Sequence, residues 1–147
     1  MKLAIICVGK IKEDYLQKGI EECSKKIRKN HTFELIELPD EKTPDGASAK
    51  EEERIKALEG EKILKKIKDD DYVIALCIEG TLSADEEWKK RVERAGEKRC
   101  VFVIGGSLGL STAVIKRAND KMSFSRMTFP HQLMRYMLLE EMSELLS

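Results

Sequence analysis

Short apolar runs alternate with amphipathic segments along the whole chain, and this alternation constrains the fold more than any other feature of the sequence. A continuous apolar run indicates a strand that is covered on both faces, as in a parallel sheet. Strands are expected at 3–8, 31–38, 72–78, 101–104 and 122–124, and helices at 12–29, 48–67, 83–95, 111–118 and from 130 onward. Five successive strand–helix units predict an α/β fold, a single-domain open parallel sheet over residues 1–147 with helices on both faces.

Composition limits the classes of function. The chain has 27 basic and 27 acidic residues, so a nucleic-acid partner would have to be met by a local patch. No apolar run approaches the length of a membrane span and no signal-peptide pattern is present, so we expect a cytoplasmic protein without membrane contact. The 4 cysteines are scattered, without a C-x-x-C pair, so no metal site is expected. Cys23, on a charged helix, is the thiol expected to be exposed.

Two polar loops follow strands in the second half of the chain, and both are candidates for ligand binding. The first, Gly105-Gly106-Ser107-Leu108-Gly109, has neither dinucleotide-fingerprint nor P-loop spacing, and on spacing alone a plain strand-to-helix turn is favoured. The second runs from Phe124 to Phe129; it could clasp an adenine, or its two phenylalanines could be core anchors. Both loops leave the sheet at one edge, where ligands bind in open α/β sheets.

Two helices carry further positions of interest. His131 and Arg135 are four residues apart and therefore share one face of the last helix. They could act as a general base and a phosphate clamp, or they could equally be a helix-start histidine and a surface arginine. Gly60 lies inside the helix expected at 48–67 and costs about 1 kcal/mol relative to alanine, so we expect a close contact or a bend there.

Six blocks of sequence together resemble the RlmH (YbeA-like) methyltransferases of the SPOUT superfamily. In chain order they are V-G-K, E-L-P-D-E-K-T-P, E-G-E-K-I-L-K-K-I, Y-V-I-A-L, F-V-I-G-G-S-L-G-L-S and F-S-R-M-T-F-P-H-Q-L-M-R. The resemblance spans almost the whole chain. Its last two blocks are specific, because a generic α/β fold demands neither of them.

This resemblance implies a homodimer with a C-terminal trefoil knot, and we expect the first and last helices to form the dimer interface. It implies an enzyme that uses S-adenosyl-L-methionine to methylate N3 of a pseudouridine in 23S ribosomal RNA. By motif, the cofactor-binding residues are Leu76, Gly105, Phe124, Ser125, Arg126, Met127, Thr128 and Phe129. Arg135 would position an RNA phosphate and His131 would accept a proton, which makes them the catalytic pair. Gly105→Val is expected to block cofactor binding and leave the fold intact.

The chain departs from the family pattern in two places. Family members continue past the last helix to a basic tail with Tyr, His and Lys, whereas three glutamates stand among the closing residues here. Weaker catalysis, weaker RNA affinity and a shallower knot are the expected consequences. Residues 80–100 form a shorter segment than is usual. A second function therefore stays open, a non-catalytic dimeric scaffold or ribosome-associated binding module, and a flavodoxin-like phosphate binder is a weaker third interpretation.

Overall fold

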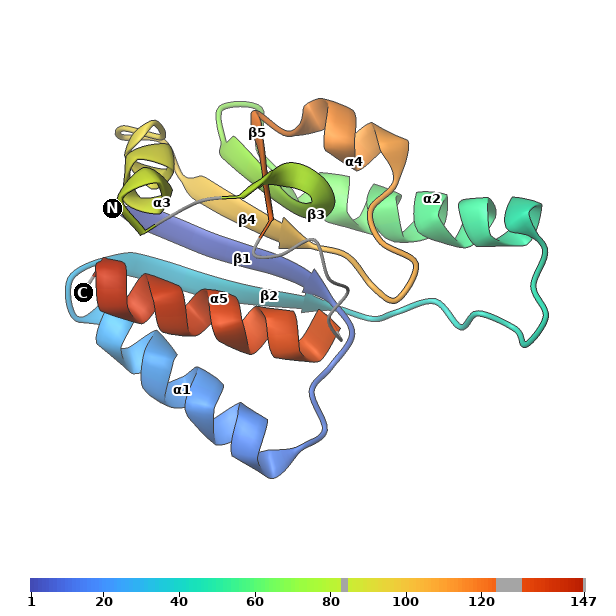
Figure 1. Ribbon diagram of the computed structural model, residues 1–147, viewed down its shortest axis with the longest axis horizontal. Coiled ribbons are helices and arrows are strands. Elements are labelled where there is room, and N and C mark those ends of the chain that lie inside the picture. The colour runs from blue at the N-terminus through green and yellow to red at the C-terminus, as the bar shows by residue number, and fades with distance from the viewer. Residues whose placement is uncertain (83–84, 124–130, 147) are drawn as a thin grey trace.

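The computed structural model describes residues 1–82, 85–123 and 131–146, and it has the predicted alternation of strands and helices (Figure 1). The strands are β1 (Lys2–Val8), β2 (Thr32–Leu38), β3 (Tyr72–Leu82), β4 (Cys100–Ile104) and β5 (Asp120–Ser123). The helices are α1 (Asp14–Arg28), α2 (Ala49–Lys66), α3 (Asp85–Glu93), α4 (Thr112–Arg117) and α5 (His131–Leu145). The predicted α/β class is confirmed.

All 5 strands pair in parallel, in the order β2-β1-β4-β3-β5. The connections from β1 to β2 and from β3 to β4 run in one direction across the sheet, and those from β2 to β3 and from β4 to β5 run in the other. Accordingly, α1 and α3 lie on one face together with α5, and α2 and α4 cover the opposite face (Figure 1). This division is what crossovers of a single hand require.

The core has two layers because every second residue of a strand points to the same face. In β1, Leu3, Ile5 and Cys7 pack toward α1, α3 and α5, while Ala4, Ile6 and Val8 pack toward α2 and α4. Burial on both faces explains why this strand is apolar without interruption.

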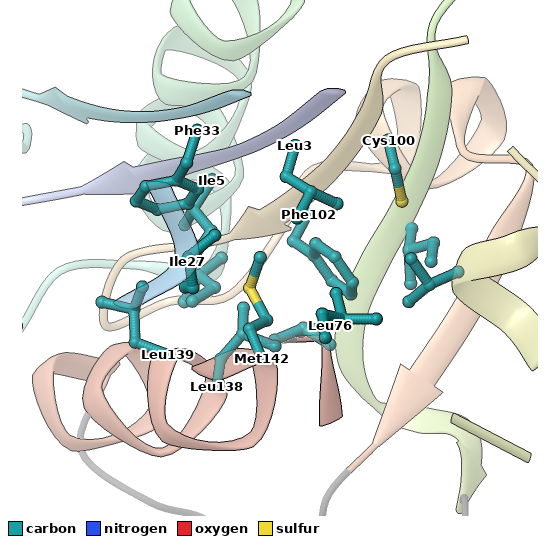
Figure 2. Close-up of a cluster of buried hydrophobic side chains, with 14 of the residues drawn as sticks. Leu3, Ile5, Ile27, Phe33, Leu76, Cys100, Phe102, Leu138, Leu139 and Met142 are labelled. Carbon is teal, nitrogen blue, oxygen red and sulfur yellow. The ribbon is translucent and has the colours of Figure 1, made fainter. Parts of the chain in front are cut away.

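The larger core layer is closed by aromatic and long aliphatic side chains. Trp88 of α3 is buried and stacks on Phe102 of β4 with ring centroids 5.7 Å apart, so it anchors its charged helix as an apolar residue would. From α5, Leu138, Leu139 and Met142 point into the same layer (Figure 2). The last helix is therefore part of the core.

Two expectations were wrong. β3 continues to Leu82, so Glu79-Gly80 does not end the strand; instead Leu76 and Thr81 both pair with Met122, and the register shifts between them. A bulge of this kind re-aims a strand and is common beside functional sites. Cys23 is buried, because it lies on the stripe of α1 that joins the core layer shared with α5.

Two global properties bear on function. Within the described residues, no helix is long and apolar enough to cross a membrane. The predicted trefoil knot depends on the path of the chain through 83–84 and 124–130, which lie outside the described residues. The knot stays a prediction.

Candidate functional site

The strands of the parallel sheet all end at one edge, here called the C-terminal edge, and the candidate residues gather there. β1 and β4 are neighbours whose connections lead to opposite faces, which makes the gap between their ends the usual position for a ligand. Gly9 follows β1 with a φ of 94°, and its N–H donates to Leu38 O over 2.7 Å. This bond joins the ends of β1 and β2, and the pairing of Cys7 with Ile104 places the end of β1 beside the residues that follow β4.

Residues 105–109, here called the glycine turn, leave the end of β4. Gly109 N donates to Gly106 O over 3.0 Å, and Gly109 has a φ of 88°, a conformation that glycine adopts without strain. Ser111 then begins α4, its Oγ accepting a hydrogen bond from Val114 N over 3.3 Å. A methyl group on Gly109 would meet no atom of the described residues within 4 Å, so among these residues nothing covers the outer side of the turn.

Gly105 is required by the turn itself. A methyl group there would lie 2.7 Å from the carbonyl carbon of Gly109 and 2.8 Å from its oxygen. Real Cβ atoms do not approach backbone so closely, and the backbone cannot move without opening the turn. The expectation that Gly105→Val leaves the fold intact is therefore wrong. The substitution would deform the turn as well as any site beside it.

Leu76 lies next to the glycine turn. β3 and β4 pair with Ala75 opposite Val103, which places Leu76 beside Ile104, the last residue before the turn. Leu76 is 5% exposed and packs in the core layer shared with α5. Two of the predicted cofactor-binding residues, Leu76 and Gly105, are thus brought together at the C-terminal edge.

The other predicted cofactor-binding residues follow β5, which ends at Ser123 on this edge. Phe124, Ser125, Arg126, Met127, Thr128 and Phe129 lie outside the described residues. Their contact with a cofactor stays a prediction.

Arg135 ties α5 to the ends of β1 and β2. Its side chain is completely buried; Nη1 donates to Glu37 Oε2 over 2.7 Å, and Nη2 donates to Val8 O over 3.3 Å and to Gly9 O over 2.9 Å. Arg135 Nε has no hydrogen-bond partner among the described residues. A guanidinium enclosed in this way organises the edge of the sheet, and its predicted contact with an RNA phosphate stays a prediction.

His131 is the first residue of α5. The backbone of the helix places it one turn before Arg135, as its spacing predicts. Its side chain lies outside the part of the chain that the structure describes.

Sequence reasoning missed Glu59, a buried carboxylate at this edge. Glu59 belongs to α2, is 5% exposed, and accepts a hydrogen bond at Oε2 from Glu41 N over 3.0 Å. Its other oxygen, Oε1, has no partner within the described residues. A signal was present in the sequence: Glu59 lies four residues from both Ile55 and Ile63, on the apolar stripe of its helix.

The arrangement suits a ligand that has an apolar ring and hydrogen-bonding edges. The glycine turn lets a ligand approach the backbone closely, and Leu76 brings an aliphatic side chain beside it. No group of three or more metal-ligating side chains gathers anywhere in the described residues. The open side of the turn and the neighbouring leucine are compatible with an adenosine-type cofactor, and the contacts of Leu76 and Gly105 with that cofactor stay predictions.

Comparison with known proteins gives consistent results. The model of a family described as predicted SPOUT methyltransferases matches residues 1–143. A ribosomal RNA large subunit methyltransferase H 1 from Clostridium perfringens is 54% identical over 144 residues, which cover 96% of this chain and 91% of the relative. A ribosomal RNA large subunit methyltransferase H from Streptococcus pneumoniae is 51% identical over 144 residues, with the same coverage of 96% and 91%.

Two solved structures share the fold at low sequence identity. A protein from Legionella pneumophila, solved in complex with the bound cofactor SAM, gives a TM-score of 0.56 at 10% identity over 98% of this chain and 66% of that one. A methylase family protein from Haemophilus influenzae gives a TM-score of 0.52 at 14% identity over 97% of this chain and 65% of that one. This chain therefore spans slightly less than two thirds of each protein, and the likeness concerns the fold.

Proposed function

Because this chain belongs to the SPOUT methyltransferase family, we propose that it is an S-adenosylmethionine-dependent methyltransferase of large-subunit ribosomal RNA. The proposed target is N3 of a pseudouridine in 23S RNA, and a ribosomal substrate places the protein in the cytoplasm. The trefoil knot and the homodimer are parts of the same proposal.

One structural observation supports the cofactor part of the proposal. Leu76 of β3, the glycine turn after β4 and the end of β5 at Ser123 lie on adjacent strands toward the same edge of the sheet. We propose that Leu76 packs against the adenosine, that backbone groups from Gly105 onward hydrogen-bond to it, and that residues 124–129 enclose the cofactor.

The proposed chemistry makes few demands on side chains. S-adenosylmethionine supplies, when bound, a methyl group that its sulfonium already activates. The protein's residues must then hold the base in line and remove one proton from N3. We propose that His131, at the start of α5, accepts this proton. Arg135 holds His131 in place indirectly, because it fixes α5 to the ends of β1 and β2.

RNA would be met by a local patch of positive charge. Lys10 and Lys12 are exposed in the segment that follows β1, at the C-terminal edge. The chain as a whole has no net charge, so its overall field does not attract RNA. We therefore propose that Lys10 and Lys12, which lie close to the site, contact the RNA phosphates.

Calorimetric titration with S-adenosylmethionine, followed by a transfer assay, tests the function. We expect saturable binding, and we expect label from tritiated S-adenosylmethionine to enter the 23S RNA of large subunits that lack the modification. Nucleoside analysis should identify N3-methylpseudouridine. Binding without transfer would leave the scaffold interpretation, and a folded protein that does not bind the cofactor would overturn the proposed function.

The homodimer is proposed to form through α1 and α5. These helices lie side by side on one face (Figure 1). The ring of Tyr136 in α5 lies against Gly19 in α1. Within the described residues, the exposed large apolar side chains are those of Tyr15 and Leu133, in the first turns of the two helices, at 73% and 38%. A second copy of the chain would cover them.

Tyr15→Glu combined with Leu133→Glu is therefore expected to convert the dimer to a monomer at micromolar concentration, because paired charges would have to be buried in the interface. Light scattering measures the change in mass. Ala57→Glu, at an exposed position of α2 on the opposite face, is the control and should leave the mass unchanged. A wild-type monomer, or a double variant that still dimerises, would contradict this interface.

A further inference from the structure

Two neighbouring residues of α2, Glu59 and Gly60, contact Gly106 near the start of the glycine turn and Ser111 just beyond its end. A methyl group on Gly106 would lie 3.1 Å from Glu59 Oε1 and 3.3 Å from Oε2, so the carboxyl group rests against that glycine. At the other end, a methyl group on Gly60 would lie 2.2 Å from Ser111 Oγ. Ser111 thus fills the space that a side chain at position 60 would need. Adjacent positions of one helix thus contact the turn near its beginning and the residue that caps α4 just after its end.

Glu59 also holds a second segment. Its Oε2 accepts a hydrogen bond from the backbone N–H of Glu41, in the loop that joins β2 to α2, over 3.0 Å. The side chain of Glu41 in turn pairs with Lys62, one turn further along α2, over 2.8 Å. One buried carboxyl group therefore links the loop after β2 to the glycine turn after β4.

We propose that Glu59 is a positioning residue for the cofactor site: it fixes the glycine turn in the shape that binds S-adenosylmethionine and couples the turn to the loop after β2. This inference rests on the proposed function. Filling a core position is better done by an apolar side chain, because burying a carboxyl group with an unpartnered oxygen, as Oε1 is among the described residues, is costly. The hydrogen bond from the Glu41 amide, accepted while the carboxyl group rests against Gly106, is what a leucine at this position would lack.

The protonation state of Glu59 offers a way to observe this role. Burial raises the pKa of Glu59; the hydrogen bond from the Glu41 amide opposes the rise, the charges of Asp40 and Glu41 add to it, and Lys62 opposes it. Because the pKa is raised, stabilisation from this group is present at low pH and is lost as the pH rises through the pKa of the folded protein. Glutamine, which resembles the protonated acid and cannot ionise, should abolish this loss.

Three variants separate positioning from a general effect on folding. Glu59→Ala removes the carboxyl group, Glu59→Gln retains its shape, and Glu61→Ala changes an exposed glutamate two residues further along α2 as the matched control. Hydrogen exchange of the ligand-free proteins reports on residues 105–111 and 39–48. Calorimetry with S-adenosylmethionine at a series of pH values above the ordinary pKa of a glutamate, about 4.3, reports how affinity depends on pH.

Glu59→Ala is expected to speed exchange in both segments, to leave the exchange of β1 and β4 unchanged, and to weaken cofactor binding about tenfold or more. Glu59→Gln should bind within about threefold of the wild type, with less dependence on pH. Glu61→Ala should match the wild type in both measurements.

Equal exchange at residues 105–111 in Glu59→Ala and Glu61→Ala would overturn the inference, and so would unchanged cofactor affinity in Glu59→Ala. If the wild type itself does not bind S-adenosylmethionine, the proposed function fails, and the exchange comparison alone decides whether Glu59 positions the turn. If Glu59→Ala does not fold, the pH profile of exchange in Glu59→Gln decides, and a profile identical to that of the wild type overturns the inference.

Discussion

Arg135→Ala is expected to lower the free energy of unfolding by about 3 kcal/mol, the low end of the range for breaking a buried ion pair. The substitution removes a charged donor from Glu37 and from the carbonyl oxygens of Val8 and Gly9. Both carbonyl groups belong to buried residues and would lose the guanidinium as a hydrogen-bond donor. The Glu37 side chain, by contrast, is 38% exposed and can turn to water. In a thermal scan the midpoint should fall by about 6–12 °C.

Two variants make this result interpretable. Arg135→Lys keeps the positive charge but not the planar fork that reaches several acceptors at once, so we expect an intermediate loss. Arg94→Ala removes an exposed arginine near the end of α3 and should change the stability by no more than about 0.5 kcal/mol. If Arg135→Ala costs as little as Arg94→Ala, desolvation of the guanidinium cancels all of its contacts, and the C-terminal edge is held by other interactions.

Gly60→Ala is expected to destabilise the protein by about 2 kcal/mol, although alanine is the better helix former by about 1 kcal/mol. The added methyl group would lie 2.2 Å from Ser111 Oγ and 3.0 Å from Ser111 Cβ. Ser111 would have to rotate away from Val114 N, which it caps at the start of α4, or α2 would have to move from the sheet. Urea unfolding measures the loss, and the sign is the opposite of the one that helix propensity predicts.

A double-mutant cycle with Ser111→Ala tests this explanation. Ser111→Ala alone should cost about 1 kcal/mol through the lost cap. The double variant should lose less than the sum of the single losses, because the hydroxyl oxygen that the added methyl group would strike is gone. Additive losses would mean that the two positions do not contact each other, and a gain in stability in Gly60→Ala would mean that the helix accommodates the methyl group.

The elements of the fold could be predicted from local patterns, but their arrangement could not. Continuous apolar runs indicated β1 and β4, and the close contact at Gly60 follows from an otherwise unfavourable helical glycine. The end of β3 was missed because Glu79-Gly80 is a strong local turn signal. Its pairing with β5, a strand some 40 residues later in the chain, overrides that signal. Strand order depends on the same kind of distant pairing.

The candidate site was predicted in part for the same reason. Resemblance to a family pointed to Leu76 and Gly105, and the structure brings them to one edge. Periodicity placed Arg135 only on the same face as His131, because α5 is apolar over much of its circumference and gives no clear polar side. The partner that explains its burial, Glu37, is 98 residues away. Glu59 was readable as an acid on an apolar stripe, but its contacts with Gly106 and the Glu41 amide depend on tertiary structure.

The contact between Arg135 and the end of β1 has a consequence for the order of events during synthesis. The carbonyl group of Gly9 is made early, and its guanidinium donor follows 126 residues later. While the chain is being translated, β1 can pair with β2, but the end of β1 cannot be completed until α5 has left the ribosome and docked. Nascent or prematurely terminated chains would thus carry most of the sheet without a finished C-terminal edge. The ability of a chain to bind a ligand would then indicate that its translation has passed position 135.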